Sequence, residues 1–487
     1  MRLTLTFDYD SARRTGLMSG SYFDQIRNIF SVENDAAKFA RHYGRFIPRR
    51  KYMITPTGRF DPCLFYEIRK YIKSNNIDVK LHQTEAFLDM VRPSYNTNHI
   101  PDLSLPLRDY QRSVVSNCLQ LGRGVTVLAT AGGKTLTIAS LIESIYHTDN
   151  KVKVLIIVPD LMLVNQTYDD FRSYGVHFSY SKWTGNNKLD LSSHTIIANM
   201  GILQSSKTDI SWIEHVDTLI IDEVHKLRKG NKINKVIQSV RTHNRFGFTG
   251  TMPENPEDQW NIIGKIGPII YEKNSHQLRE QNYIANAEAL ILKLEYTNAP
   301  RHFFRSPTDP GERYRKESEF LRSNKFRNNV LSTVVSNFQN NGLLLVDYIE
   351  HGELLTTHFK NNCKDKEIFF IQGDVPVDQR DEIKKLIEKK KNIICIAISK
   401  IFSTGISINN LHYIVFAGGG KAKIKILQSI GRGLRKHVDK KKVVIVDIAD
   451  QLYYGKKHMN KRMSIYKEEH LNYGTKTIKE KTKEKAG

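Results

Sequence analysis

An alternation of short apolar runs with longer amphipathic stretches constrains the fold of this chain more than any other feature. Strands that are buried on both faces between covering helices have this nearly continuous apolar character. We therefore expect an α/β protein with two doubly wound parallel sheets in tandem. The runs begin after Leu107 and restart after about residue 290; they are Val125–Leu128, Val152–Val158, Thr195–Ala198, Thr218–Ile221 and Phe246–Phe248, then Gly342–Val346, Glu367–Ile371, Asn392–Ile398, Tyr413–Phe416 and Val443–Asp447.

Residues 1–95 lie outside this rhythm and predict a small additional α/β domain. They combine strand-like runs at Arg2–Asp8 and Lys51–Thr55 with a stretch of helical apolar spacing at Pro62–Ser74. The segment Tyr95–Pro106 is rich in proline and small polar residues, which is typical of a linker. The expected organisation is a small basic N-terminal domain (1–95), two α/β domains (105–288 and 289–455) and a lysine-rich tail (456–487) that is frayed or loosely helical.

The charge of the chain indicates its class of partner. There are 74 Lys and Arg against 51 Asp and Glu, a net charge of +23, which favours nucleic acid over an anionic membrane surface. No apolar run approaches the ~18–20 residues of a membrane span, and the N-terminus lacks the apolar stretch of a signal peptide. The 4 cysteines form no C-x-x-C pair, and the 17 histidines show no H-x-x-x-H spacing typical of a metal site. We expect a cytoplasmic protein without a disulfide framework, a zinc ribbon or a membrane partner.

A phosphate-binding loop is predicted at residues 128–135, with the sequence Leu-Ala-Thr-Ala-Gly-Gly-Lys-Thr. The loop joins an apolar run to the helix-like stretch Leu136–Ile145, and its small residues let backbone N–H groups converge on phosphate oxygens. Lys134 would reach the β- and γ-phosphates of ATP, and the Thr135 hydroxyl would bind Mg²⁺. The first glycine of the G-x-x-x-x-G-K-[ST] pattern is replaced by Leu128. The candidate ATP-binding residues of the loop are Thr130, Ala131, Gly132, Gly133, Lys134 and Thr135.

An acid pair, Asp222 and Glu223, directly follows the apolar run Thr218–Ile221. The carboxyl end of a buried strand is where open α/β sheets bind ligands. Asp222 is suited to hold Mg²⁺, and Glu223 to polarise the water that attacks the γ-phosphate. Taken alone, the acid pair could instead be an exposed acidic turn. The phosphate loop and the acid pair follow each other in this order about 90 residues apart, and together they predict ATP hydrolysis.

With these two elements in place, residues 105–450 resemble the superfamily-2 helicases. Residues 107–111 (LRDYQ) resemble the adenine-reading motif of that family, and residues 158–166 resemble its first strand-contacting motif. Residues 247–252 stand at the place of motif III, and residues 398–407 and 428–435 (QSIGRGLR) resemble motifs V and VI. The resemblance implies two RecA-like domains with ATP and Mg²⁺ between them. The resemblance assigns ATP contacts to Arg108, Gln111 and Gly405, and catalytic roles to Gln428, Arg432 and Arg435. It assigns strand contacts to Asn165 and Thr404. His225 would link the acid pair to motif III.

Motifs V and VI, together with the stretch from Phe30 to Phe60, are similar to those of the phage recombination helicases of the UvsW type. This similarity implies an ATP-driven DNA helicase that acts on branched, forked or single-stranded DNA, with replication or recombination proteins as further partners. The stretch Arg41–Lys51 holds five cationic residues and no acid, with aromatic residues between them, which suits phosphate contacts and base stacking. Packing of the small domain's core is the alternative role of the aromatic residues. The candidate DNA-binding residues are Arg41, Tyr43, Arg45, Phe46, Arg49, Arg50 and Lys51.

Three other functions remain as alternatives. RNA could replace DNA as the substrate, although the Asp-Glu-Val-His sequence at 222–225 favours DNA. A non-catalytic DNA-binding scaffold would be expected to have lost Lys134, Glu223 or one of the two motif VI arginines, and all of them are present. A restriction-type motor subunit is disfavoured because no carboxylate–lysine cluster of a nuclease stands out. ATPase rates with no nucleic acid, single-stranded DNA, forked DNA and RNA discriminate among these functions.

Overall fold

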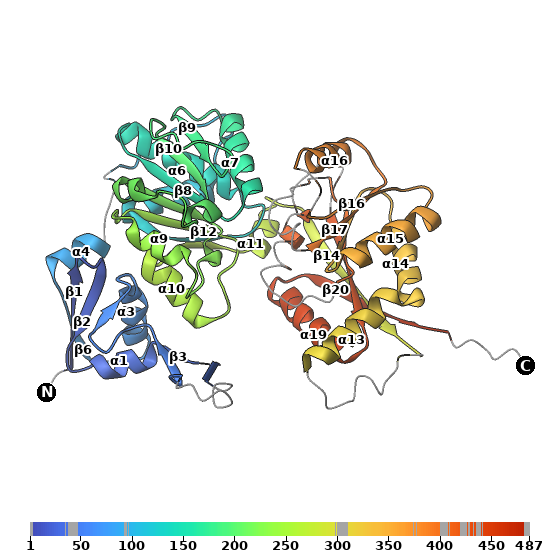
Figure 1. The fold of residues 1–487 in the computed structure, drawn as a ribbon, viewed down its shortest axis with the longest axis horizontal. Helices are drawn as coiled ribbons and strands as arrows, with labels where there is room; N and C mark the ends of the chain where they lie inside the picture. The colour runs from blue at the N-terminus through green and yellow to red at the C-terminus, as the bar shows by residue number, and fades with distance from the viewer. Residues whose placement is uncertain are drawn as a thin grey trace, which may run out of the picture. The chain divides into compact units, whose positions relative to one another are not determined.

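The computed structural model of the chain divides into two compact units, each built on a parallel sheet between helices (Figure 1). Unit 1 comprises Met1–Leu128 and Gly133–Lys273, and unit 2 comprises Ala129–Gly132 and Asn274–Gly487. The domain boundaries expected from the sequence stay predictions. The structure describes residues 3–34, 36–37, 47–91, 95, 97–297, 299, 310–373, 375, 377–399, 408, 410–418, 426, 429–431, 433–434, 440 and 442–481.

The N-terminal part of unit 1 is a small mixed sheet that is covered by helices. The strand order is β5-β2-β1-β6, in which β1 pairs antiparallel with β2 and parallel with β6. Phe7, Phe65 and Phe87 are fully buried in its core. The helix expected at Pro62–Ser74 is present as α3. The elements are β1 (Leu3–Asp10), β2 (Thr15–Ser19), α1 (Phe23–Ile29), β3 (Ser31–Glu33), β4 (Arg50–Tyr52), β5 (Arg59–Phe60), α3 (Leu64–Ser74), β6 (Val79–Gln83) and α4 (Glu85–Val91).

This N-terminal part packs, mainly through α3, against helix α10 (Pro256–Ile266) of the same unit. The rings of Phe30 and Trp260 lie 5.1 Å apart, and Lys265 Nζ lies 2.5 Å from Asp61 Oδ1. The expected linker Tyr95–Pro106 contains no helix or strand among its described residues. Tyr95 fastens it to the central sheet, because its hydroxyl lies 2.5 Å from Thr218 Oγ1.

The central sheet of unit 1 has seven strands in the order β13-β7-β12-β11-β8-β10-β9, and every pair is parallel. Alternate residues of β8 enter two different cores: Leu155 and Ile157 face one layer of helices, and Val154, Ile156 and Val158 face the other. Burial on both faces explains the continuous apolar runs and confirms the expected doubly wound fold. The elements are α5 (Asp109–Leu121), β7 (Arg123–Leu128), α6 (Lys134–Thr148), β8 (Val154–Val158), α7 (Leu161–Tyr174), β9 (Tyr180–Trp183), β10 (Thr195–Asn199), α8 (Met200–Leu203), β11 (Thr218–Asp222), α9 (Ile233–Ser239), β12 (Arg245–Thr249), α10 and β13 (Ile269–Lys273).

Unit 2 contains a second parallel sheet of seven strands, in the order β16-β17-β15-β18-β19-β14-β20. The expectation of a frayed or loosely helical tail from residue 456 was wrong, because α19 covers the sheet and β20 pairs in parallel with β14 along its length. The elements are α11 (Ser275–Glu280), β14 (Asn286–Glu295), α13 (Pro310–Ser323), α14 (Lys325–Asn337), β15 (Gly342–Val346), α15 (Ile349–Asn362), β16 (Glu367–Ile371), α16 (Val377–Lys389), β17 (Ile393–Ile398), β18 (Tyr413–Phe416), β19 (Lys442–Asp450), α19 (Tyr453–Glu468) and β20 (Asn472–Lys479).

The four cysteines are buried free thiols. Within the described part of the chain, no helix is both long and apolar enough to cross a membrane.

Candidate functional site

The predicted phosphate loop connects the buried strand β7 to helix α6, which begins at Lys134. Ala131 and Gly133 have positive φ angles of 69° and 78°, so the backbone turns through left-handed conformations directly before the helix. A Cβ atom at Gly133 would lie 2.3 Å from Gln111 Nε2, so a larger residue would displace the Gln111 amide and would also be strained at this positive φ. Left-handed residues before a helix N-terminus aim backbone N–H groups into a concavity that suits an anion. The residues present therefore fit a phosphate group.

Gln111 joins the expected adenine-reading motif to this loop. Its side-chain Nε2 donates a hydrogen bond to Gly133 O at 3.2 Å, and its Oε1 accepts one from Arg108 N at 2.9 Å. The Arg108 guanidinium in turn donates to the Tyr110 hydroxyl at 3.0 Å. Two motifs that were assigned separately from the sequence are thus in direct contact within unit 1.

The acid pair lies at the carboxyl end of β11 and faces the lysine of the loop. Glu223 adopts a left-handed φ of 52°, and its N–H donates to Asp222 Oδ1 at 2.9 Å. Lys134 Nζ lies 3.6 Å from Glu223 Oε1. His225 Nδ1 lies 3.1 Å from Glu223 Oε2 and 2.9 Å from Thr249 Oγ1 in the motif III segment. The structure therefore brings the loop, the acid pair and motif III into one chain of contacts.

The electrostatics of the acid pair favour an added cation. Burial raises the pKa of Asp222 to about 7, and the neighbouring Glu223 carboxylate adds to the rise, while Lys134 opposes it. Burial removes the water that would stabilise the Asp222 carboxylate, and a cation bound beside it would stabilise that charge instead. The Asp222 carboxylate and the Thr135 hydroxyl are oxygen donors of the kind that Mg²⁺ prefers. The donor set therefore fits this ion.

The candidate DNA-binding residues that the structure describes differ in the hydrogen bonds and ion pairs that their side chains form. Arg49 is exposed. Arg50 Nε donates to Ser31 Oγ at 2.8 Å, and Lys51 Nζ lies 3.5 Å from Glu257 Oε2. Asn165 accepts a hydrogen bond from Lys182 Nζ at 3.1 Å. The candidates Arg41, Tyr43, Arg45, Phe46, Thr404, Gly405, Gln428, Arg432 and Arg435 lie outside the described residues.

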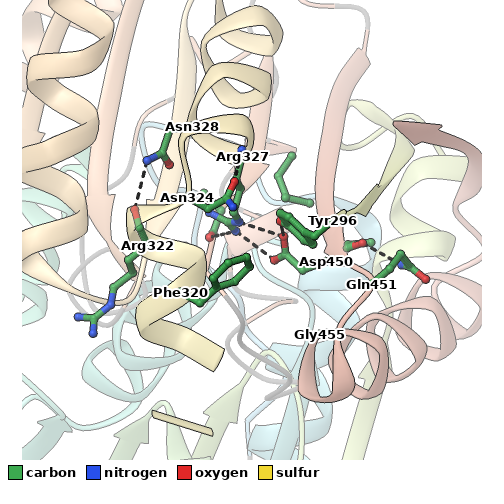
Figure 2. A network of polar contacts seen from close by, with 12 residues as sticks. Tyr296, Phe320, Arg322, Asn324, Arg327, Asn328, Asp450, Gln451 and Gly455 are labelled. Atoms are coloured by element: carbon green, nitrogen blue, oxygen red, sulfur yellow. Dashed lines mark hydrogen bonds and ion pairs between the residues drawn. The ribbon is translucent and has the colours of Figure 1, made fainter. Parts of the chain in front are cut away.

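A buried polar network at the carboxyl edge of the unit 2 sheet was not expected from the sequence (Figure 2). Arg327 donates to the Asp450 carboxylate from Nε at 3.0 Å and from Nη2 at 3.2 Å, and to Ala417 O at 2.7 Å. The Tyr296 hydroxyl also donates to Asp450. The adjacent cavity of about 50 Å³ has room for water and not for a nucleotide. The network therefore joins α14 to the ends of β18 and β19.

Two family models match the chain, one in each of the two regions that form the seven-stranded parallel sheets. Residues 104–254 match the model of the type III restriction enzyme res subunit, and residues 324–437 match that of the helicase conserved C-terminal domain. The two models appear in the order in which the phosphate-loop sheet and the second sheet follow each other along the chain.

Relatives match most of the chain. It is 29% identical to the ATP-dependent DNA helicase uvsW of Enterobacteria phage T4, over 94% of this chain and 96% of the relative. It is 27% identical to the DNA 3'-5' translocase XPB2 of Sulfurisphaera tokodaii, over 78% of this chain and 88% of the relative.

Among solved structures, the DNA-bound type ISP restriction-modification enzyme LlaBIII matches with a TM-score of 0.59 at 13% identity, over 85% of this chain and 34% of that one. At this identity the match shows the fold alone. Taken with the phosphate loop, the acid pair and the two family models, the relatives establish the family. The chain therefore belongs to the superfamily-2 helicases, which are ATP-hydrolysing enzymes, and it is similar to the phage UvsW type.

Proposed function

We propose that the protein is an ATP-dependent DNA helicase or translocase that remodels branched DNA, by fork regression, junction branch migration or unwinding of displacement loops and R-loops. The observation that carries the ATP-dependent activity is the 3.6 Å contact between Lys134 Nζ and Glu223 Oε1 beside a left-handed phosphate loop. The similarity to the T4 helicase along 94% of the chain supports DNA as the substrate. In this proposal residues 1–95 are a basic DNA-binding domain, and 105–288 and 289–455 are the two motor domains.

The residues of the site have separate roles in ATP hydrolysis. The loop backbone and the Lys134 ammonium bind the β- and γ-phosphates, so that Lys134 leaves Glu223 when ATP enters. The freed Glu223 carboxylate then orients the attacking water and accepts its proton. Thr135 and Asp222 would hold Mg²⁺, which neutralises phosphate charge when it is bound. His225 couples the position of the Glu223 side chain to that of Thr249, since its Nδ1 contacts both side chains.

The remaining assigned residues act on the nucleotide or on DNA. Arg432 and Arg435 supply positive charge to the γ-phosphate in the transition state, a role worth ~10³–10⁵ in rate for an arginine finger. Arg49 and its cationic neighbours neutralise backbone phosphates, so that binding is independent of base sequence.

The experiment measures ATPase turnover of Lys134→Ala and Glu223→Gln with no nucleic acid, single-stranded DNA, forked DNA, four-way junctions and RNA. Each variant should lose at least ~3 kcal/mol of transition-state stabilisation, about two decades in rate, while DNA binding survives. Glu214→Gln is the matched control, because Glu214 lies in the same unit but pairs at the surface with Arg241 Nη2 at 2.5 Å. Near-normal turnover of either site variant would contradict the assignment.

Strand displacement then tests the substrate. The wild-type protein should unwind forks, four-way junctions and displacement loops faster than it displaces a strand from a plain duplex, and Glu223→Gln should unwind none of them. Stimulation of the ATPase by RNA equal to that by DNA would favour the RNA helicase alternative. Junction binding without any ATPase would favour the scaffold alternative.

A further inference from the structure

Three side chains that commonly bind metal ions converge in unit 1, away from the phosphate loop. Glu143 and His147 lie in the C-terminal half of α6, and His177 lies between α7 and β9. His177 Nδ1 is 2.7 Å from Glu143 Oε1, and His147 Nε2 is 3.2 Å from the same oxygen. One donor atom from each residue lies within 4.8 Å of the donor atoms of the other two.

The burial of Glu143 gives this cluster its significance. Its side chain is 0% exposed, while those of His147 and His177 are 43% and 65% exposed. Among the described residues, both ion-pair partners of the carboxylate are imidazoles. A buried carboxylate is costly unless a positive charge compensates it. A metal ion bound by Glu143 and the two imidazoles supplies this charge without requiring a proton on either ring.

The spacing of the donor atoms suits a tetrahedral ion. Glu143 and His147 are four residues apart and therefore lie on one face of the helix. Zinc-to-ligand distances of ~2.0–2.2 Å place the ligand atoms about 3.4 Å from one another in a tetrahedral site. The observed 3.2 Å from His147 matches this separation, and the 2.7 Å from His177 needs to widen by less than 1 Å.

The second oxygen of Glu143 is also positioned. Glu143 Oε2 accepts a hydrogen bond from His177 N at 3.1 Å. A ligand carboxylate is commonly oriented by such a bond to its other oxygen. The exposure of both imidazole rings leaves an entry path and a fourth coordination position that water can occupy.

We propose that Glu143, His147 and His177 form a binding site for a divalent transition-metal ion, with Zn²⁺ as the expected occupant. Two nitrogen donors and one carboxylate favour Zn²⁺ over Mg²⁺, which takes oxygen ligands. The ion joins the C-terminal half of α6 to the segment that precedes β9, so it stabilises the helix that begins at Lys134. It is separate from the Mg²⁺ of the phosphate site.

The test uses full-length untagged protein, stripped with a chelator and dialysed at slightly alkaline pH. Isothermal titration with ZnCl₂ should show one equivalent per chain, and Co²⁺ at the same site should show the visible absorption of a tetrahedral complex. The melting temperature should rise by about 5 °C or more at a Zn²⁺ concentration 100 times the dissociation constant. His177→Ala and His147→Ala should lose the equivalent and the thermal shift.

His82→Ala is the matched control, because His82 is an exposed histidine on β6, outside the cluster; it should bind like the wild type. Glu143→Gln keeps the shape of the buried side chain and should lose the affinity. If that variant does not fold, His177→Ala decides, since its side chain is 65% exposed and its loss leaves no cavity. Absence of stoichiometric binding, or binding that His177→Ala leaves unchanged, would overturn the proposal and leave the cluster as hydrogen bonding only.

Discussion

Replacing Asp450 by Asn should destabilise unit 2 by about 3–5 kcal/mol, the cost of leaving a buried charge without its partner. Arg327 and Asp450 are 3% and 5% exposed, with Nε 3.0 Å from Oδ1 (Figure 2). At this separation and an effective dielectric constant of about 20, the direct attraction is about 5.5 kcal/mol. Asn preserves the shape of the side chain, so the loss measures the stranded Arg327 guanidinium and not a cavity.

A neighbouring exposed pair is the matched control. Arg322 Nη1 lies 3.2 Å from Glu350 Oε2, but these side chains are 25% and 85% exposed, so Glu350→Gln should cost about 0–1 kcal/mol. Urea unfolding and calorimetry of the full chain measure both variants. The double replacement Arg327→Met with Asp450→Leu should recover most of the loss, because it removes both buried charges. A loss below 1 kcal/mol for Asp450→Asn, or one equal to that of Glu350→Gln, would refute the reasoning.

Three further predictions concern catalysis, DNA binding and acid stability. Arg432→Ala and Arg435→Ala should each bind nucleotide almost normally while DNA-stimulated turnover falls by ~10³ or more; lost affinity with unchanged turnover would contradict the finger role. The double variant Arg49→Gln with Arg50→Gln should lower the salt slope of junction binding, measured by fluorescence anisotropy, by up to about two; an unchanged slope would exclude phosphate contacts there. Burial lowers the pKa of His194 to about 4 in the folded state. As the pH falls, the unfolded state therefore binds a proton on this residue before the folded state does, and the free energy of unfolding decreases between about pH 6.5 and pH 4. His194→Gln should therefore remove about 2 kcal/mol of the stability lost between pH 7 and pH 5 in urea titrations; equal losses would contradict this.

The sheets were predictable where strands are buried on both faces. Val154–Val158 and Thr218–Asp222 are fully buried strands, and their apolar runs stand out in the sequence. Strand β20 (Asn472–Lys479) was missed because it is an edge strand with mostly exposed polar residues. Charged edge strands lack the apolar signal and are common at sheet edges because they oppose aggregation.

The site was predictable where its chemistry is local in sequence. The loop ending at Lys134 and the acid pair ending at Glu223 are each a short motif, and parallel-sheet topology places both at carboxyl ends of strands. The Arg327–Asp450 pair joins residues 123 apart, and the His177–Glu143 contact joins residues 34 apart. Neither pair has a local signature, because only the folded chain brings its members together.

The position of β14 has a consequence for synthesis on the ribosome. This strand pairs on one side with β19 and on the other with β20, so both of its neighbours emerge long after it. About 190 residues separate the start of β14 from the end of β20, which at 5–20 residues per second is roughly 10–40 s of translation. Until β19 has been made the Leu290–Leu294 segment has neither partner strand, and it then lacks β20 until the end of the interval, whereas every strand of unit 1 has already been made. The nascent protein is therefore most exposed to chaperones, proteases and mispairing while its second half is translated, and a stop codon before residue 472 would leave one edge of β14 permanently open.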